Sequence, residues 1–287
     1  MTEARIRLAY AGLHPTRRRS LVEQYGSAAA VVSRVARGAI DVPDAARAAV
    51  TVSAADRRAE LSAAGFRLVS IDDDEYPPVL SMLPDAPEVL FVRGRLEADR
   101  GVAVVGTRRC TAYGKALAKK YGRVIGSAGW ELVSGLARGI DIAAHRGTSS
   151  AEAVGIAVLG CGLDVDYPRG HRSIANRLVE LGGGVISEYP PGSIPEGWRF
   201  PPRNRIIAGL ARATVVVEAA ETGGALITAS LALDYGRSVF AVPGDVDRAT
   251  SRGCNLLIRD GAHPVLDPAD LVAELELVLG PVGSPGP

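Results

Sequence analysis

The sequence predicts an α/β protein with a doubly wound, mostly parallel sheet, preceded by a small all-helical domain. From residue 102 onward, short and continuously apolar segments alternate with amphipathic ones. Continuously apolar strands are typical of a sheet that helices cover on both faces. Before residue 67 the apolar residues instead recur at helical spacings, which indicates a separate helical unit.

Residues 1–66 are predicted to form the helical domain, with glycine and proline residues interrupting the pattern. The stretch 13–26 predicts a pair of short helices around a tight turn. It carries Arg17, Arg18 and Arg19. Two roles stay open for these arginines: contact with phosphates, or plain solvation on the surface of a bundle.

Residues 67–101 predict a connector and an edge strand. Four prolines, at positions 77, 78, 84 and 87, punctuate this segment and argue against a long regular element. The apolar run at 89–94 predicts the edge strand.

Residues 102–280 predict the main domain, in which strands and helices alternate. The predicted strands span 102–106, 131–135, 155–160, 184–188, 213–218 and 238–243. The predicted helices span 113–127, 139–148, 171–181, 203–211, 223–236 and 269–279. The Gly/Pro-rich residues 281–287 predict a flexible tail.

The composition excludes several classes of protein. With 33 basic and 32 acidic residues the net charge is +1, which excludes a global polycation but permits a local basic groove. The three cysteines lie far apart, with no Cys-x-x-Cys pair, so we expect no metal site and no disulfide framework. No signal peptide and no membrane-spanning run are recognisable, and we expect a cytoplasmic protein.

Loops of small and polar residues follow the predicted strands. In an open parallel sheet, ligands bind outside the carboxyl ends of the strands, next to helix N-termini that favour anions. We therefore expect an anion-binding ledge there. The alternative, that the glycines only make tight turns, explains one or two of these loops but not five, which span 106–109, 134–141, 159–164, 187–192 and 221–225.

The expected anion is a phosphodiester. After Gly106 the next glycine is Gly114, so the dinucleotide fingerprint is absent, and the Walker pattern is absent as well. Guanidinium groups at the ends of strands suit a phosphodiester, because its oxygens accept paired hydrogen bonds. The arginines in such places are Arg108, Arg109, Arg138, Arg169, Arg203 and Arg205.

Acidic and aromatic residues share these loops. Asp141, Asp164, Glu188 and Glu218 are expected to pair with and orient the arginines, with a general base as the alternative. His145 is read as a residue of a helix face rather than of the rim. Tyrosine rings could stack on bases of a single strand, and three of them fall in the loops: Tyr113, Tyr167 and Tyr189.

Five collinear motifs between about residues 70 and 265 resemble the DprA (Smf) family of DNA-processing proteins. They are Val105-Gly-Thr-Arg-Arg, the run from Ser134 to His145, the run from Ala157 to Pro168, Phe200-Pro-Pro-Arg-Asn-Arg and Phe240-Ala-Val-Pro-Gly-Asp. The resemblance implies an extended Rossmann-like domain that binds single-stranded DNA and forms a homodimer, preceded by a SAM-like helical domain. It also implies protection of incoming DNA in natural transformation and loading of the recombinase RecA.

The resemblance and the loop pattern together give the expected DNA-binding residues. Arg108 and Arg169 match basic positions that touch the DNA backbone in that family. We expect no catalytic residue, no cofactor and no metal. The full expected set is Gly106, Thr107, Arg108, Arg109, Gly135, Arg138, Gly139, Tyr167, Arg169, Arg203, Asn204, Arg205, Gly223 and Gly224.

The chain departs from the family pattern in three places. Gly223-Gly224-Ala225 stands where the family often has Ser-Gly-Ser, so only backbone amides remain as donors there. Thr107 replaces a common serine, which is a mild change. We also expect no carboxy-terminal winged-helix domain, because the chain ends soon after Leu279.

Two other functions stay open. A related Rossmann-like fold hydrolyses the bond between base and ribose in nucleoside monophosphates, using a glutamate after a Pro-Gly-Gly loop. The stretch 222–230 has two glycines but no such glutamate, which favours a binding protein over this phosphoribohydrolase-like enzyme. The second alternative is a scaffold with a vestigial ledge, and the five loops argue against it.

Overall fold

Five short helices precede the sheet in the computed structural model, which describes residues 2–98 and 100–281. Two of them have a serine as N-cap residue: the hydroxyl of Ser27 accepts a hydrogen bond from the Ala30 amide, and that of Ser53 accepts one from the Asp56 amide. The helices are α1 (Glu3–Ala9), α2 (Pro15–Tyr25), α3 (Ala28–Ala36), α4 (Asp44–Ala49) and α5 (Ala54–Ala63).

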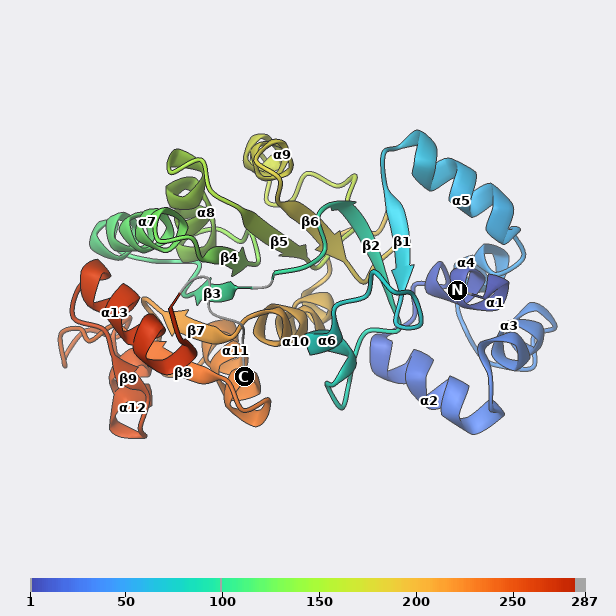
Figure 1. Ribbon diagram of the computed structural model, residues 1–287. Coiled ribbons are helices and arrows are strands. Elements are labelled where there is room, and N and C mark those ends of the chain that lie inside the picture. The colour runs from blue at the N-terminus through green and yellow to red at the C-terminus, as the bar shows by residue number, and fades with distance from the viewer. Residues whose placement is uncertain (1, 99, 282–287) are drawn as a thin grey trace.

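One sheet runs through the rest of the molecule (Figure 1). Within the described residues it has nine strands in the order β1-β2-β6-β5-β4-β3-β7-β8-β9. β1 pairs antiparallel with β2, β2 pairs antiparallel with β6, and all other pairs are parallel. The strands are β1 (Arg67–Ser70), β2 (Val89–Gly94), β3 (Gly101–Val105), β4 (Glu131–Ser134), β5 (Gly155–Leu159), β6 (Gly184–Ser187), β7 (Ala213–Val216), β8 (Ser238–Ala241) and β9 (His263–Pro264).

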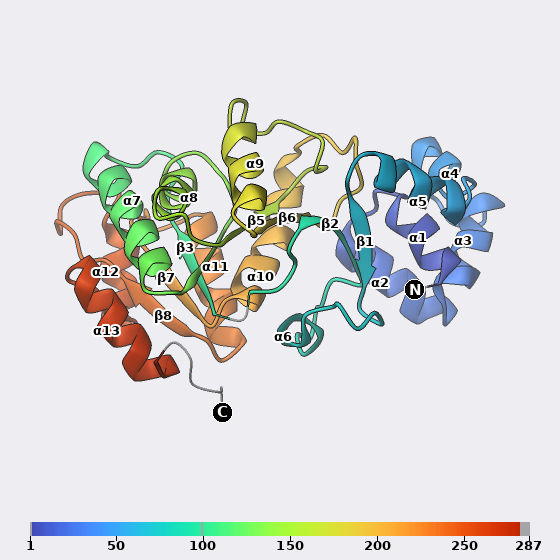
Figure 2. The ribbon, with the colours of Figure 1, turned by 45° about the horizontal axis from the view of Figure 1, so that its top comes forward.

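Helices cover both faces of the sheet, as Figures 1 and 2 show. One face packs against α7 (Ala112–Ser127), α8 (Ile140–Ser150), α9 (Arg172–Glu180) and α13 (Pro268–Leu279). The other packs against α6 (Pro78–Ser81), α10 (Phe200–Leu210), α11 (Gly224–Asp234) and α12 (Arg252–Arg259). The side chains of β3 alternate between the two cores, since Val102 and Val104 belong to one and Ala103 and Val105 to the other.

The strand order reverses at β3, and this fixes where a crevice opens. From β3 the chain continues to β4, β5 and β6 on one side of β3. It then crosses back to β7 on the other side and continues to β8 and β9. In a doubly wound sheet, the connections on the two sides of such a switch point diverge and leave a ligand-binding crevice at the carboxyl ends of the strands.

The doubly wound α/β fold predicted from the sequence is confirmed, and each predicted strand overlaps an observed one. Two details differ. The segment 67–70 is a strand, β1, so the sheet continues two antiparallel strands beyond its parallel part. Residues 15–25 form one helix rather than two short ones, because Pro15 occupies its first turn, where a proline is tolerated, instead of breaking it.

The division of the chain into separate domains at residues 66 and 101 stays a prediction. The predicted tail lies outside the described residues except for Pro281. Among the described residues, no helix is long and apolar enough to cross a membrane. The same residues contain no cluster of three side chains suited to hold a metal ion.

Candidate functional site

Two adjoining cavities open at the carboxyl ends of the central strands, and we call them together the furrow. The larger has a volume of about 650 Å³ and lies where β3 and β7 end, against α10 and α11. The smaller, of about 300 Å³, extends past the ends of β4 and β5. Six residues line both cavities, so the two are continuous: Arg108, Arg109, Ala137, Tyr167, Phe200 and Arg203. The furrow therefore occupies the topological switch point.

The loop after β3 supplies two of the exposed positive charges of the furrow. Arg108 and Arg109 are both exposed, and neither forms an ion pair with any described residue. The Arg108 guanidinium lies 4.6 Å from the centre of the Phe200 ring, so an aromatic face holds it in place. Guanidinium groups without a carboxylate partner are available to an external anion.

The loop after β4 approaches the loop after β3 closely. Gly139 has φ +83°, and a Cβ there would lie 2.3 Å from the carbonyl oxygen of Thr107, so only glycine fits. A Cβ on Gly135 would lie 2.3 Å from Nη1 of Arg203. Between them Leu136 has φ +52°, an uncommon conformation for a residue with a branched side chain. This backbone brings the N-terminus of α8 and Arg138 to the furrow.

Helix α10 forms the inner wall of the furrow. Arg203 is only 4 % exposed, and its Nη1 donates to the carbonyl oxygens of Gly135 and Val158. Its Nε donates to Oδ1 of Asn204 at 3.3 Å, and Nδ2 of Asn204 donates to the carbonyl oxygen of Gly224 at 3.2 Å. α10 is thereby tied to the loop after β4, to β5 and to the start of α11.

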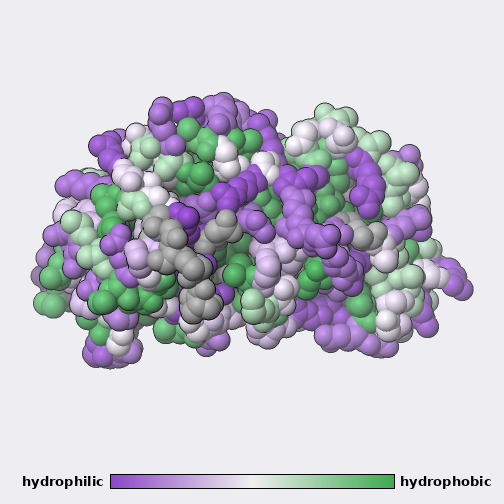
Figure 3. All heavy atoms as spheres, viewed as in Figure 1, coloured by the Kyte–Doolittle hydropathy of each residue, from purple (hydrophilic) through white to green (hydrophobic). Residues whose placement is uncertain are grey.

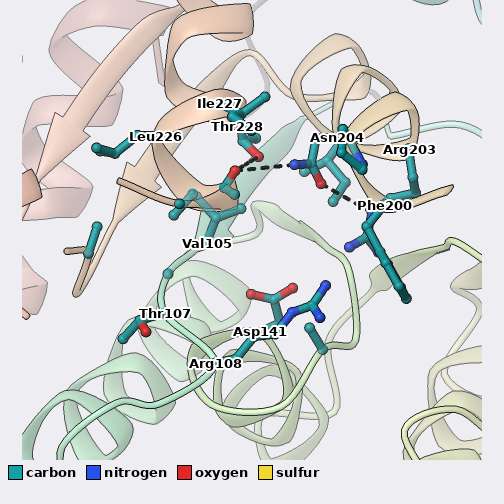
Figure 4. Close-up of a pocket in the computed structure, with 18 of the residues that line it drawn as sticks. Val105, Thr107, Arg108, Asp141, Phe200, Arg203, Asn204, Leu226, Ile227 and Thr228 are labelled. Atoms are coloured by element: carbon teal, nitrogen blue, oxygen red, sulfur yellow. Dashed lines mark hydrogen bonds between the residues drawn. The ribbon is translucent and has the colours of Figure 1, made fainter. Parts of the chain in front are cut away.

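Helix α11 begins at the furrow with Gly223 and Gly224. The first N–H groups of a helix have no partner inside it and carry a partial positive charge. The hydroxyl of Thr228 donates to the carbonyl oxygen of Gly224 at 3.0 Å, the same oxygen that Asn204 contacts (Figure 4). These two bonds fix the first turn of α11 beside the exposed arginines.

A buried carboxylate lies beside Arg108, and Figure 4 shows the two side chains next to each other. Asp141 is 5 % exposed and accepts a hydrogen bond from the Gly135 amide at 3.2 Å. Burial raises the pKa of Asp141, and the charge of Arg203 partly offsets this. Burial likewise lowers the pKa of Arg203. Asp141 thus holds the loop after β4 and counters part of the charge of the inner wall.

The structure brings most of the predicted site residues together. Gly139 positions the furrow without lining it, and Arg169 is exposed outside it. Arg205 lies elsewhere, buried in ion pairs with Glu188 and Asp85. The predicted residues that line the furrow are Gly106, Thr107, Arg108, Arg109, Gly135, Arg138, Tyr167, Arg203, Asn204, Gly223 and Gly224.

The three tyrosines of the predicted loops do not lie together. Tyr189 is 2 % exposed, and its hydroxyl donates to the carbonyl oxygen of Arg199, so it belongs to the core. Tyr113 is 64 % exposed but lines neither cavity. Only Tyr167 lies in the furrow, with its ring centre 5.7 Å from that of Phe200. Sequence position near a loop did not reveal which rings turn inward.

The four acidic residues have different roles. Glu188 does pair with arginines, as expected. Glu218 instead accepts hydrogen bonds from the amide and the hydroxyl of Thr111 at the start of α7, and Asp164 accepts one from the Gly192 amide. His145 is fully buried in the core and does not reach the rim.

Phe200 is the functional candidate that the residue-by-residue reasoning missed. It lines both cavities and lies between Arg108 and Tyr167. A signal was present, because Phe200 precedes Arg203 by three residues and Asn204 by four, which places all three on one face of a helix. Figure 4 shows them on the same wall of the pocket.

Comparison with known families identifies the architecture. The model of the family described as DNA recombination-mediator protein A matches residues 67–276. The chain belongs to this family. The match contains the whole furrow and all strands from β1 to β9.

Bacterial members of this family are similar in sequence to most of this chain. DNA processing protein DprA of Streptococcus pneumoniae is 45% identical over 218 residues, which are 74% of this chain and 75% of that protein. Protein Smf of Escherichia coli is 42% identical over 214 residues, 74% of this chain and 57% of that protein. The chain thus spans about half to three-fifths of the Escherichia coli and Synechocystis relatives.

Solved structures of the family agree with the fold. The X-ray structure of DNA processing protein A from Streptococcus pneumoniae gives a TM-score of 0.74 at 34% identity, covering 96% of this chain and 98% of that one. A structure of the Helicobacter pylori protein, which describes its mode of binding single-stranded DNA, gives 0.66 at 25% identity and covers 74% and 96%.

Proposed function

We propose that the chain binds single-stranded DNA in the furrow. The observation that carries this proposal is the set of exposed arginines, Arg108, Arg109 and Arg138, which pair with no carboxylate among the described residues. Arg108 and Arg109 line the same cavity as the N-terminus of α11, and all three arginines line the smaller cavity together with the rings of Phe200 and Tyr167. The Helicobacter pylori relative, with its described single-stranded DNA binding mode, supports the same conclusion.

Each part of the furrow has a place in this binding. The exposed guanidinium groups and the first amides of α11 hold phosphates, because both donate hydrogen bonds from a positive environment. Phe200 and Tyr167 stack on bases, a contact worth about 1–3 kcal/mol per base that every base can make. The buried Arg203 and Asn204 shape the wall that carries Phe200.

This arrangement selects single strands over duplexes. In a duplex the bases are already stacked on one another and cannot reach the rings of Phe200 and Tyr167. Contacts to phosphates carry no sequence information, so we expect little dependence of the affinity on base sequence. Figure 3 shows the face of the molecule seen in Figure 1 as a mosaic of hydrophilic and hydrophobic residues. Because the net charge of the chain is only +1, we expect the affinity to depend on the local arginines of the furrow, Arg108, Arg109 and Arg138.

Titration of a fluorescent oligothymidine at several salt concentrations tests the proposal. We expect the logarithm of the association constant to fall with the logarithm of salt concentration, with a slope of about −0.7 for each neutralised phosphate. A duplex of the same length serves as the competitor and should displace the oligothymidine poorly. Binding that does not respond to salt, or equal affinity for the duplex, would contradict the proposal.

The wider role follows the family. We infer that the chain forms a homodimer, which raises the effective concentration of the second furrow along one strand. We further infer that it protects incoming DNA and loads RecA in transformation or recombination. A RecA strand-exchange assay with DNA pre-bound by this protein tests the loading. The same preparation, incubated with nucleoside monophosphates, should release no free base, because we propose a binding protein and not a hydrolase.

A further inference from the structure

We propose that the N-terminal helix α2 holds α10 in its binding geometry, with Arg18 as the principal positioning residue. This inference rests on the proposed binding of DNA in the furrow. It concerns a part of the molecule that does not line the furrow. The contacts that carry it run from α2 to the end of β6 and from there to α10.

Arg18 is buried although it belongs to a surface helix. Its exposed fraction is 4 %, and its Nη2 donates to Oε1 of Glu188 at 2.8 Å. Its Nε lies 3.3 Å from a carboxylate oxygen of Glu88. Neither of the two sequence interpretations of this arginine, a phosphate contact or a solvated side chain, describes it. Arg18 instead joins the helical domain to the sheet.

Glu188 also forms an ion pair with Arg205 of α10. Nη2 of Arg205 donates to both carboxylate oxygens of Glu188, at 2.9 and 2.8 Å. Glu188 is 2 % exposed and Arg205 is 6 % exposed. One buried carboxylate is therefore shared by an arginine of α2 and an arginine of α10. Charge-assisted bonds of this kind are short and directional, so they fix the position of α10 relative to α2.

A second contact joins α2 to the beginning of α10. The ring of His14, which caps α2, lies 5.3 Å from the ring of Trp198. Trp198 belongs to the short turn Gly197–Arg199, which leads directly into α10 at Phe200. Trp198 also packs edge-on against the buried Tyr189. α2 thus contacts α10 both through Glu188 and through the turn before Phe200.

The position of α10 matters for binding because this helix forms a wall of the furrow. Phe200, Arg203 and Asn204 all lie on α10 and line the furrow, and Arg205 follows them directly. The network also reaches the far end of α11, because Asp85 contacts Nε of Arg205 at 3.4 Å and accepts a hydrogen bond from Tyr235 at 2.8 Å. A shift of α2 would therefore move α10 and α11, whose first turns line the furrow.

The substitution Arg18→Met tests this inference, with Arg17→Met as the matched control. Arg17 lies on the same helix, but its side chain donates to the carbonyl oxygen of Asp41 within the helical domain. We expect Arg18→Met to weaken oligothymidine binding about five- to tenfold, within the usual range for coupled sites, and Arg17→Met to leave it unchanged. The salt slope should stay the same in both variants, because no phosphate contact is lost.

Hydrogen exchange of α2 gives a second readout that depends on coupling alone. Since coupling between two sites is reciprocal, oligothymidine should slow amide exchange over residues 15–25 in the wild-type chain and in Arg17→Met. This protection should be lost in Arg18→Met. If Arg18→Met fails to fold, His14→Asn replaces it. That variant keeps an acceptor for the first turn of α2 but removes the ring that contacts Trp198. It should lose both oligothymidine affinity and exchange protection of α2, each by less than Arg18→Met.

The outcomes separate this inference from the proposed function. Unchanged affinity and unchanged protection in a folded Arg18→Met or His14→Asn variant would overturn the inference while the proposed function stands. A salt slope reduced by about 0.7 in Arg18→Met would also overturn it, since that marks a direct phosphate contact. Absence of binding by the wild-type chain would overturn the proposed function itself.

Discussion

The furrow and the interface between α2 and α10 both contain several arginines, but they use them in opposite ways. At the interface, Arg18 and Arg205 are buried and share the carboxylate of Glu188. In the furrow, Arg108 and Arg109 are exposed and have no carboxylate partner among the described residues. The first arrangement holds parts of the protein together, whereas the second leaves positive charge for a ligand.

Helix α10 carries two buried arginines, two residues apart, that have different partners. Arg203 is bonded to backbone carbonyl oxygens at the wall of the furrow, and Arg205 is ion-paired on the side that faces α2. Successive side chains on a helix point in different directions, so an Arg-x-Arg pattern divides its two charges between two surroundings. We infer that an arginine near a site is available to a ligand where no carboxylate among the described residues forms an ion pair with it, as for Arg108, and that it holds the protein together where one does, as for Arg205.

The largest effect is expected from removing the shared carboxylate of the interface. Glu188→Gln leaves two buried guanidinium groups without their common countercharge. Loss of one member of a buried ion network typically costs about 3–5 kcal/mol of the free energy of unfolding. Urea denaturation should show this loss, and Glu180→Gln, which breaks an exposed pair with Arg177, should change the free energy by less than about 1 kcal/mol. Similar small losses in both variants would remove the distinction between the regions.

The next effect tests the furrow itself. Arg108→Glu replaces an unpaired positive charge by a negative one, and we expect oligothymidine affinity to fall about 100-fold. This corresponds to the loss of a charge-assisted hydrogen bond of about 1.5–3 kcal/mol together with repulsion of phosphates. Fluorescence anisotropy measures the affinity. Arg123→Glu, the same charge change at an exposed position on α7 outside the furrow, should weaken binding only slightly, and thermal unfolding should be unchanged in both.

A third prediction concerns a titratable group of α8 that is buried in the core without an ion pair to any described residue, in contrast to the arginines of the interface. Burial lowers the pKa of His145 from 6.5 to about 3. Its contribution to stability is therefore complete above pH 6.5 and is lost as the pH falls from 6.5 toward 3, because the unfolded chain takes up the proton first. From pH 7 to pH 5 the free energy of unfolding should fall by about 2 kcal/mol on this account.

Urea denaturation at the two pH values, on the wild type and on His145→Leu, measures this contribution. The variant should show a flatter dependence on pH. An equal dependence in both proteins would assign the acid sensitivity to other groups.

The smallest effect distinguishes stacking from charge within the furrow. Phe200→Leu keeps an apolar side chain on α10 but removes the aromatic face, so oligothymidine affinity should fall by about 1 kcal/mol, or roughly fivefold. The salt slope should stay unchanged. Tyr113→Leu removes an exposed ring that lies outside the furrow and should leave the affinity unaltered. If the two variants behave alike, Phe200 does not stack on bases.

Much of this arrangement could be predicted from particular residues. Six continuously apolar runs predicted a parallel sheet, because strands buried on both faces are apolar throughout. These runs form the strands β3, β4, β5, β6, β7 and β8. The small and polar residues in the loops after β3 and β4 predicted a ligand-binding site at these strand ends. The burial of Tyr189 could not be predicted, because the local sequence does not indicate whether a side chain in a loop next to a strand end turns toward the core or toward the solvent. For the same reason Arg205 and Arg203 could not be told apart.

The order of apolar and polar residues alone determined the α/β fold, the strand ends at which a ligand binds, and the presence of arginines there. These features depend on the short-range periodicity of apolar residues, which can be read from the sequence. Tertiary structure alone decided which arginines stay unpaired, because a carboxylate comes to an arginine from anywhere in the sequence. Arg18 and Glu188 are 170 positions apart and yet 2.8 Å from each other.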